Sequence, residues 1–440
     1  MDENIEEYYV GLPEDLVVKV LGPYALIGKL SEGYPNLQVI NEYALTLLRL
    51  VDGRTKVRTL IEKFCTHYNV ECTEEVRAQV LDFILKAREY GHIILSKSPI
   101  ESKRITDLEM KLGPLELVLE ITHRCNLRCI HCYANSSPES SAEMKYEHAI
   151  RILDEFSRAG TVVVEITGGE PTIHRDFTHI LQYALERFQL VTVLSNGTNI
   201  SEQIIDVCRK YKNKIVFSIT LYSYREEVHD AITSVKGSWK RTVENIKKLV
   251  DEGIRVRGSI VYMHLNQYDI LKTIEFLKDL GVTIITFSPT LPYGRASRIA
   301  NDVMKLDYTS IMTQLNEAMR KYRDKLQIVP EEILRFVERH GCGAGWRTLV
   351  IDPHGIAKLC VYGGPVFGNV LQEPVEAIIK RSSKMFHIEP PNRNICGECK
   401  YLNFCRGCYF RGLTASKLFN IQECKYLKYF EQKYNYTEIS

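Results

Sequence analysis

The middle of the chain alternates short apolar runs with longer stretches in which apolar residues recur at helical spacing. Each short run favours a buried β-strand, and stretches such as Ala149–Ala159 and Val243–Val250 favour amphipathic helices. This alternation predicts an α/β fold with a parallel sheet covered by helices. Six repeats are too few to close an eight-stranded barrel. The six predicted strands are Leu115–Ile121, Val162–Thr167, Leu190–Ser195, Lys214–Leu221, Arg255–Tyr262 and Thr283–Ser288.

The N-terminal part has a different pattern, with two short apolar runs followed by three amphipathic stretches. The runs predict a hairpin because a Gly-Pro pair separates them. The stretches predict helices, two of which begin after a residue that can cap a helix. A small sheet with three helices is a winged-helix-like arrangement. The predicted elements are strands Leu16–Leu21 and Tyr24–Leu30 around Gly22-Pro23, helices that begin after Asn41, at Val57 and after Thr73, and a strand at His92–Leu95.

These patterns divide the chain into four segments. Residues 1–97 form the winged-helix-like domain, and residues 98–112 form a polar, charged linker. Residues 113–320 hold the alternating strands and helices, and residues 321–440 form a cysteine-rich C-terminal segment. A chain of 440 residues has ample core for such domains.

Charge and hydropathy narrow the classes of partner. The chain has 57 basic and 55 acidic residues, so neither a nucleic-acid groove nor a polybasic membrane surface is indicated. No apolar run approaches the ~18 residues that span a bilayer. The acidic N-terminus carries no signal-peptide pattern. We therefore expect a cytoplasmic protein with no nucleic-acid or membrane partner.

The cysteine content indicates metal or redox chemistry. Thirteen cysteines in a chain of this kind favour metal binding over disulfides. Ten of them fall into two clusters, and we expect Cys65, Cys72 and Cys208, which stand apart, to be ordinary thiols.

The first cluster is the C-x3-C-x2-C motif of Cys125, Cys129 and Cys132, directly after the strand predicted at Leu115–Ile121. Three thiolates on a loop at a strand end can hold three corners of a 4Fe–4S cubane and leave the fourth iron open. An open iron is a place for a substrate or cosubstrate to bind. A zinc site or three unrelated buried thiols are the alternatives.

This motif and its context closely resemble the signature of radical S-adenosylmethionine (SAM) enzymes. The resemblance covers residues 113–320 and implies a partial (β/α)6 barrel. It also implies that the amino and carboxylate groups of SAM chelate the open iron, so Cys125, Cys129 and Cys132 would be essential for catalysis. His131 stands where the family has an aromatic residue just before the third cysteine, which implies a place beside the cofactor.

A second motif, Thr167-Gly168-Gly169-Glu170-Pro171, follows the second predicted strand. Two glycines let the backbone approach a ligand without a Cβ clash, and Glu170 offers a carboxylate to a cation. The family's Gly-Gly-Glu motif binds the ammonium group of SAM. The resemblance therefore implies this role for Gly168, Gly169 and Glu170.

Polar residues on later strands also resemble positions that the family uses. Ser195 and Asn196 end the third predicted strand, and Ser218 lies in the fourth. Family members contact the ribose and methionine carboxylate of SAM from these positions, which implies cofactor binding here. Residues 294–296 resemble the family's Gly-Arg-Ala turn, and a plain surface turn is an equal alternative.

The C-terminal segment contains seven cysteines in another spacing. Its two C-x2-C pairs are five residues apart, too close for the ~15–20 residues of a zinc ribbon. The pattern resembles the SPASM extension, which carries two auxiliary iron–sulfur clusters in peptide-modifying radical SAM enzymes. As a departure, two residues separate Cys405 from Cys408, where the family usually has three.

Two fully ligated cubanes need eight cysteines, and this segment has seven. The family's interleaved pattern implies four thiolates on an outer cluster, and three thiolates and an open iron on an inner one. We hypothesise that the open iron binds a substrate cysteine thiolate. A water, a non-cysteine ligand or a cysteine from elsewhere is the alternative. The implied ligands are Cys396, Cys399, Cys405 and Cys424 for the outer cluster and Cys342, Cys360 and Cys408 for the inner one.

The stretch Val39–Phe64 is similar to PqqD-like domains, which recognise the leader peptides of ribosomally made, post-translationally modified peptides. In those domains the leader adds as an extra strand to a sheet edge. A plain dimerisation or stabilising domain is the alternative. DNA binding is disfavoured because the predicted helices include no basic recognition helix.

Together these features resemble thioether-forming maturases of sactipeptides and ranthipeptides. The expected cofactors are three 4Fe–4S clusters and SAM. The expected partners are a precursor peptide, with its leader on residues 1–97, and a small electron donor such as flavodoxin or ferredoxin. The expected reaction is a cysteine thioether cross-link after hydrogen abstraction by a 5′-deoxyadenosyl radical.

Other reactions on the same scaffold remain open from the sequence. They are carbon–carbon cross-linking, epimerisation, formylglycine formation and decarboxylation of a haem precursor. An iron–sulfur electron carrier or a DNA-binding regulator is the non-enzymatic alternative.

Overall fold

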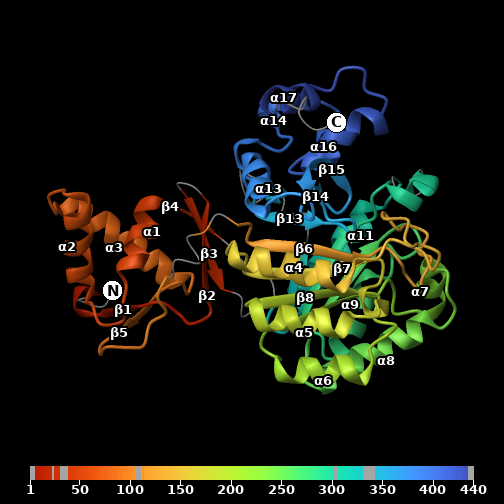
Figure 1. The fold of residues 1–440 in the computed structure, drawn as a ribbon, viewed down its shortest axis with the longest axis horizontal. Helices are drawn as coiled ribbons and strands as arrows, with labels where there is room; N and C mark the ends of the chain where they lie inside the picture. Colours follow the sequence, from red (N-terminus) through yellow and green to blue (C-terminus); the bar gives the residue numbers. More distant parts are fainter. Residues whose placement is uncertain are drawn as a thin grey trace. The chain divides into compact units, whose positions relative to one another are not determined.

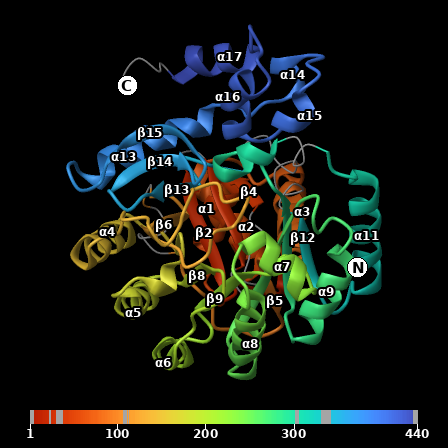
Figure 2. The same ribbon diagram turned by 90° about the vertical axis from the view of Figure 1, so that its right-hand side faces the viewer.

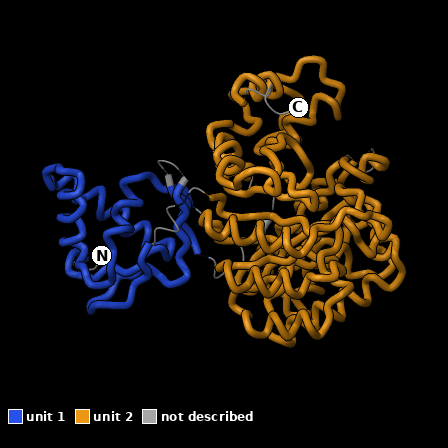
Figure 3. Tube along the Cα trace, in the orientation of Figure 1, with its two compact units in different colours: residues 1–112 blue, residues 113–440 orange. Residues whose placement is uncertain are grey.

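The computed structural model describes residues 5–21, 24–29, 38–105, 111, 113–300, 305–330 and 342–434. The chain forms two compact units, Met1–Leu112 and Gly113–Ser440, which Figure 3 shows in different colours. The second unit contains both the alternating strands and helices and the cysteine-rich segment.

The described residues of the first unit form two small antiparallel sheets and three α-helices (Figure 1). Strands β2 and β3 pair antiparallel, which confirms the predicted hairpin. Its turn at Gly22-Pro23 lies outside the described residues. The strand predicted at His92–Leu95 forms at Ile94–Ser96 and pairs with β1, a strand that the sequence pattern missed. The elements are β1 (Tyr9–Gly11), β2 (Leu16–Leu21), β3 (Tyr24–Lys29), β4 (Gln38–Asn41), α1 (Glu42–Leu50), α2 (Val57–Tyr68), α3 (Glu74–Glu89) and β5 (Ile94–Ser96).

All three predicted helices of this unit form, and the predicted caps are present. Asn41 Oδ1 accepts a hydrogen bond from Ala44 N at 3.0 Å at the start of α1. Thr73 Oγ1 accepts one from Val76 N at 3.4 Å at the start of α3. The apolar faces of the helices and the inner faces of the strands pack together in one hydrophobic core, which holds the sheets against the helices.

The first part of the polar connector, residues 98–105, is fastened to this unit. Ile100 N donates a hydrogen bond to Gly53 O at 2.9 Å, and Lys103 N donates one to Leu12 O at 3.1 Å. Main-chain bonds of this kind do not depend on side-chain polarity. The polar composition of this stretch predicted a linker, and it could not indicate that main-chain hydrogen bonds hold residues 98–105 on the first unit.

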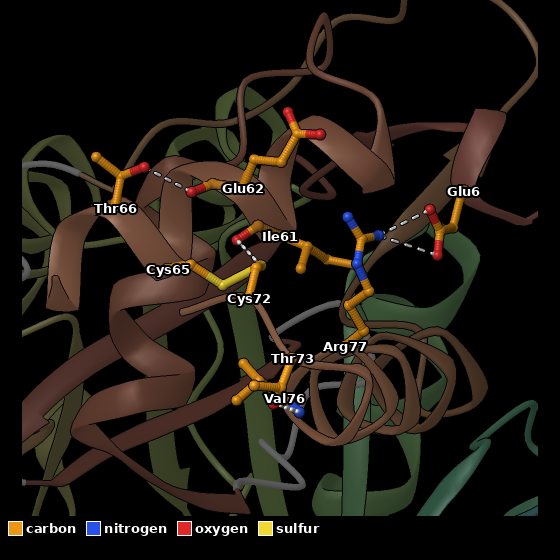
Figure 4. Close-up of a disulfide and its surroundings, with 9 residues drawn as sticks. All are labelled: Glu6, Ile61, Glu62, Cys65, Thr66, Cys72, Thr73, Val76 and Arg77. Carbon is orange, nitrogen blue, oxygen red and sulfur yellow. Dashed lines mark hydrogen bonds and ion pairs between the residues drawn. A yellow bond between two sulfur atoms is a disulfide. The ribbon is translucent and has the colours of Figure 1, made fainter. Parts of the chain in front are cut away.

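Cys65 and Cys72 form a disulfide between α2 and the loop that precedes α3 (Figure 4). The prediction of ordinary thiols was wrong for this pair. The chain reverses after α2 and brings the two Cα atoms to 5.6 Å, a normal separation for a disulfide. Cys208 is a free, buried thiol on the second unit, as predicted.

The second unit is built on a ten-stranded sheet in the order β12-β11-β10-β9-β8-β7-β6-β13-β14-β15. The predicted parallel strands all form, with bounds within one residue, and each pairs in parallel with the next. Helices follow one another around the outside of these strands in Figure 2, which confirms the predicted α/β partial barrel. The strands are β6 (Glu116–Thr122), β7 (Val163–Gly168), β8 (Leu190–Ser195), β9 (Ile215–Thr220), β10 (Arg255–Tyr262), β11 (Ile284–Pro289), β12 (Gln327–Pro330), β13 (Thr348–Ile351), β14 (Ile356–Cys360) and β15 (Gly363–Asn369).

The cysteine-rich segment continues this sheet. Strand β13 pairs in parallel with β6, and β14 and β15 add to it antiparallel. Residues on both sides of the expected boundary at 320 therefore belong to one compact unit. The α-helices within the described part are α4 (Tyr146–Arg158), α5 (Phe177–Arg187), α6 (Glu202–Lys210), α7 (Glu226–Thr233), α8 (Ser238–Asp251), α9 (Ile270–Asp279), α11 (Tyr308–Lys321), α13 (Val375–Ser382), α14 (Arg393–Cys396), α15 (Leu402–Cys405), α16 (Tyr409–Leu418) and α17 (Lys425–Tyr434).

None of the helices in the described ranges has the length and apolar character that crossing a membrane requires.

Candidate functional site

The first cysteine loop, residues 125–132, follows β6 directly. Cys125 N donates a hydrogen bond to Ser137 O at 3.1 Å, and Ile130 N donates one to Ile232 O of α7 at 2.9 Å. These bonds fix the loop between the end of a buried strand and a helix.

The three thiols of this loop lie close enough to influence one another's ionisation. Burial raises the pKa of Cys125 to about 12, and the charges of Glu170, Cys129 and Cys132 contribute. Burial also raises the pKa of Cys129 to about 12, with a contribution from Cys132. Both groups are therefore neutral thiols at physiological pH, and a bound cation would be needed to keep thiolates here.

Gly168 and Gly169 let the end of β7 lie directly on the first cysteine loop. Gly168 has φ +138°, and a Cβ there would lie 2.0 Å from Thr122 O. A Cβ on Gly169 would lie 2.3 Å from Arg124 O. The glycines therefore admit the neighbouring backbone, and their predicted approach to a ligand stays a prediction.

Glu170 is fully buried, and its carboxylate gathers side chains from two strand ends. Its Oε1 accepts hydrogen bonds from Thr172 Oγ1 at 2.6 Å and Ser195 Oγ at 2.8 Å. Its Oε2 accepts one from Asn196 N at 2.7 Å. Burial raises the pKa of Glu170, and these hydrogen bonds oppose the rise. The structure thus brings together three residues predicted from the sequence to bind SAM, namely Glu170, Ser195 and Asn196.

Asn196 joins this carboxylate group to the first cysteine loop. Its Nδ2 donates a hydrogen bond to Asn126 Oδ1 at 2.8 Å and lies 3.8 Å from Cys125 Sγ. Ser218 on the neighbouring strand β9 takes another partner, because its Oγ accepts a hydrogen bond from Arg257 Nε at 3.0 Å. The structure therefore brings Asn196 to the cysteines and leaves Ser218 in a separate pair.

His131 packs edge-on against Tyr222, with ring centroids 5.0 Å apart. Burial lowers the pKa of His131 to about 4, so its imidazole is neutral at physiological pH. Within the described residues, His131 Nδ1 has no hydrogen-bond partner. Tyr222 Oη lies 4.0 Å from Cys129 Sγ. No sequence pattern distinguishes Tyr222 from the other tyrosines among the 25 in the chain.

The turn at residues 293–295 also packs against the first cysteine loop. Arg295 N donates a hydrogen bond to Cys132 O at 2.9 Å, and Arg295 Nε donates one to Cys129 O at 2.7 Å. The alternative of a plain surface turn is therefore wrong for Arg295.

A second cysteine group lines a cavity of about 290 Å³ in the C-terminal segment. Its four thiols belong to Cys396, Cys399, Cys405 and Cys424. Burial raises the pKa of Cys405 to about 12, and the charges of the other three cysteines contribute. Four thiols around one cavity fit a cubane, because each of its four irons takes one thiolate.

No three metal-ligating side chains in the described ranges are close enough to hold a single metal ion. The thiols around a cubane stand farther apart than the ligands of one ion, because each binds its own iron.

The remaining three cysteines of the segment lie on separate elements. Cys360 ends β14, and Cys408 precedes α16. Burial raises the pKa of Tyr409, and the charge of Cys342 contributes, so Cys342 lies near the residue after Cys408. Burial likewise raises the pKa of Tyr133, with a contribution from Cys360. The structure thus places Cys360 towards the first cysteine loop, and no described cavity collects all three thiols.

An aromatic cluster lies between the first cysteine loop and the C-terminal cysteines. The ring centroids of Tyr133 and Tyr362 are 4.7 Å apart, and those of Tyr293 and Phe410 are 4.8 Å apart. Tyr362 and Phe410 stack at 5.6 Å and so join the two pairs. The sequence analysis missed this cluster. Its available signal was that Tyr133, Tyr362 and Phe410 each follow a cysteine by one or two positions.

Comparison with protein families gives three matches along the chain. Residues 30–93 match the PqqD family, described as coenzyme PQQ synthesis protein D, and residues 119–293 match the radical SAM superfamily. Residues 342–409 match SPASM, described as an iron–sulfur cluster-binding domain. The chain is a radical SAM/SPASM protein with a PqqD-like domain. The family resemblances inferred from the cysteine spacings, the Gly-Gly-Glu motif and the N-terminal pattern are confirmed.

Individual relatives extend over much of this radical SAM/SPASM chain. It is 29% identical over 401 residues to the antilisterial bacteriocin subtilosin biosynthesis protein AlbA of Bacillus subtilis (strain 168). The alignment covers 88% of this chain and 88% of AlbA. It is 24% identical over 333 residues to the AdoMet-dependent heme synthase of Methanosarcina barkeri, which covers 70% of this chain and 95% of that protein.

Solved structures share the fold. The crystal structure of Streptococcus suis SuiB bound to S-adenosylmethionine matches with a TM-score of 0.63 and 17% identity, over 94% of this chain and 98% of SuiB. SuiB bound to its precursor peptide SuiA matches with a TM-score of 0.58 and 16% identity, over 83% of this chain and 87% of SuiB.

Proposed function

We propose that this radical SAM/SPASM protein modifies a ribosomally synthesised precursor peptide and forms a cysteine thioether cross-link in it. The observation that carries the proposal is the set of seven C-terminal cysteines, four of which line one cavity and leave three for a second cluster. The bacteriocin biosynthesis named for AlbA and the precursor peptide bound by SuiB support a peptide substrate.

In this proposal Cys125, Cys129 and Cys132 hold a 4Fe–4S cluster, and SAM binds at its open corner. When bound and reduced, these groups supply the 5′-deoxyadenosyl radical that abstracts a hydrogen atom from the peptide. A small donor such as flavodoxin or ferredoxin would provide the electron. The strand end and helix that fix residues 125–132 support this assignment, because a cluster needs ligands in a constant geometry.

We assign the ammonium group of SAM to Glu170. Its Oε1 receives hydrogen bonds from Thr172 and Ser195, whereas its Oε2 receives one from Asn196 N and has capacity to accept another. Gly168 and Gly169 support the role, since they let this carboxylate stand directly beside the cysteine loop.

His131 and Ser218 complete the proposed SAM site. The neutral ring of His131 offers Nδ1 as an acceptor or donor to the cofactor, according to its tautomer. For Ser218, which pairs with Arg257 on the neighbouring strand, we propose a contact with the carboxylate of SAM, because a hydroxyl and a guanidinium are both donors suited to that group.

The C-terminal cysteines would hold two auxiliary clusters. The cavity with four thiols supports a fully ligated outer cluster. Three thiolates on the inner cluster would leave one corner for a substrate cysteine, whose thiolate would stand beside the carbon that loses hydrogen. The proposed ligands are Cys396, Cys399, Cys405 and Cys424 for the outer cluster and Cys342, Cys360 and Cys408 for the inner cluster.

We place the leader peptide as an added strand beside β4 of the first unit. In the three-stranded sheet, β2 and β4 are the edges. Connector residue Lys103 donates through Nζ to Leu16 O of β2, so that edge is partly covered. The side chains of β4 are exposed or half-buried, which favours this strand for pairing with a peptide.

The decisive experiment uses the full chain, reconstituted anaerobically with iron and sulfide, reduced with dithionite and given SAM. The probe is a synthetic precursor with a leader and a cysteine-containing core, taken from a short reading frame beside the gene. A thioether removes two hydrogen atoms and one alkylatable thiol per cross-link, and both changes are measured by mass spectrometry with and without iodoacetamide.

Each alternative reaction gives a different combination of peptide mass and thiol alkylation. A carbon–carbon cross-link removes two hydrogens but keeps the thiol alkylatable, and an epimerase leaves the mass unchanged. Formylglycine formation removes the thiol without a cross-link between residues. Any of these outcomes would replace the thioether proposal.

A small-molecule substrate is the second candidate, because the match to a haem synthase covers 95% of that enzyme. Residues 113–440 form one compact unit, so a chain without residues 1–112 can be tested. Loss of peptide modification together with retained SAM cleavage supports the leader role. Equal activity on the peptide with and without residues 1–112 would argue against it.

A further inference from the structure

The turn that follows β11 contacts the first cysteine loop through both its backbone and a side chain. Arg295 N donates to Cys132 O at 2.9 Å, and Arg295 Nε donates to Cys129 O at 2.7 Å. One residue thereby holds the carbonyls of two of the three cysteines on this loop.

The approach of the turn is close enough to require a glycine. Gly294 has φ +58°, and a Cβ there would lie 2.3 Å from Tyr133 O and 2.4 Å from Cys132 O. Any larger residue would push the turn away from the loop. The contact of Arg295 with the loop is therefore built into the backbone and is not a chance meeting of flexible side chains.

Arg295 differs in its ion pairing from the arginines on and next to the first cysteine loop. Arg124 forms an ion pair with Glu143 at 3.1 Å, and Arg128 forms one with Glu139. Within the described ranges, Arg295 has no carboxylate at ion-pair distance. Its positive charge acts on Cys129 and His131, which lie beside it.

The other side of the turn is anchored in the cysteine-rich segment. Tyr293 packs against Phe410 with ring centroids 4.8 Å apart and hydrogen-bonds Thr414. Arg295 is therefore held between the first cysteine loop and α16.

We propose that Arg295 is a positioning residue that fixes the first cysteine loop and raises the reduction potential of the group bound there. The inference rests on the proposed cluster at Cys125, Cys129 and Cys132. Reduction adds one negative charge, and a nearby cation stabilises the reduced state more than the oxidised one. Loss of the cation should make reduction harder without removing any ligand.

The test compares Arg295→Gln and Arg295→Lys with Arg298→Gln in the full-length, reconstituted protein. Arg298 lies on the same turn, is exposed, and carries the same charge. The measured quantity is the midpoint potential of the cluster whose electron paramagnetic resonance signal changes on addition of SAM. Iron and sulfide contents are measured in parallel.

We expect a more negative potential in Arg295→Gln, the wild-type potential in Arg298→Gln, and a smaller negative shift in Arg295→Lys, which keeps the charge but loses the guanidinium donor to Cys129 O. Selective loss of the SAM-responsive signal in Arg295→Gln, with Arg298→Gln intact, also supports the positioning role. A wild-type potential in Arg295→Gln, or equal loss of iron in both glutamine variants, would overturn the proposal.

These readouts need no peptide, so a failure to find a thioether product leaves the role of Arg295 standing. Absence of a SAM-responsive signal in the wild-type protein would refute the cluster site and Arg295's role together.

Discussion

The first cysteine loop and the outer cysteine cavity both present cysteine thiols, but from different kinds of secondary structure. The loop follows a buried strand of a parallel sheet and is tied by main-chain hydrogen bonds to α7. The cavity draws two of its thiols from α14 and α15, which have four residues each. Helices this short have no stability of their own. We infer that the loop is shaped before metal binds, whereas the cavity depends on the metal for part of its folding free energy.

The largest expected effect concerns the preformed loop. Cys129→Ala should reduce SAM cleavage to background, because it removes one of three ligands, and should leave the fold intact. Cys208→Ala is the control, since Cys208 is also a free thiol but lies on α6 and belongs to neither cysteine group. SAM cleavage and circular dichroism are the measurements. Comparable loss of cleavage in both variants would show that the loop is not special.

Removal of iron should destabilise the outer cysteine cavity much more than the first cysteine loop. In the metal-free protein, amide exchange in residues 393–434 should speed up strongly, since cluster binding contributes several kcal/mol to local stability. The amides of Cys125 and Ile130 should stay protected by their hydrogen bonds to Ser137 and Ile232. Hydrogen exchange with mass spectrometry measures both. Equal loss of protection at the two places would contradict the comparison.

Gly168→Ala should distort the first cysteine loop without removing any of its three cysteines. It adds a Cβ 2.0 Å from Thr122 O at φ +138°, and we expect a loss of roughly 3 kcal/mol of unfolding free energy. Gly237→Ala is the control because Gly237 also has a positive φ, +76°, but its Cβ would meet nothing closer than 3.6 Å. That variant should lose about 1 kcal/mol. Similar losses in denaturant unfolding would mean that the close packing of Gly168 on the loop is unimportant.

The smallest expected effect concerns the disulfide of the first unit. Replacing Cys65 and Cys72 by serine opens a cross-link between residues seven apart, which should cost about 2 kcal/mol in that unit. Iron content should not change, because neither cysteine belongs to a cluster site in our proposal. Thermal unfolding and iron analysis check the two parts. A loss of iron in the double variant would place this pair among the metal-binding cysteines.

The sequence was a good guide wherever one local pattern determines the outcome. The strands of the parallel sheet are short runs rich in apolar and β-favouring residues between helices, so β8 and β10 were predicted with their observed bounds. Asn41 and Thr73 were predicted as caps because capping requires only a local hydrogen bond. The C-x3-C-x2-C and Gly-Gly-Glu motifs are local in the same sense.

Features that depend on how separate segments meet were missed. The pairing of Cys65 with Cys72 depends on how the chain reverses after α2. Tyr222 contacts Cys129 across 93 residues of sequence, and nothing in its own neighbourhood signals that. The close packing of the Gly-Gly-Glu glycines on the backbone at Thr122 and Arg124 was also missed, while their predicted role at a ligand stays a prediction.

The pairing of β13 with β6 limits where this protein can be cut or recombined. A chain ended at residue 320 would expose the main-chain groups of β6 along a strand that is otherwise paired on both sides, from Glu116 to Leu119. It would also remove Lys358 on β14, which lies 2.7 Å from the 1% exposed Glu120, and would leave that carboxylate with His123 at 3.6 Å. An open edge beside a buried charge that has lost its lysine partner invites aggregation. Chimaeras between such enzymes should therefore exchange residues 113–434 as one piece.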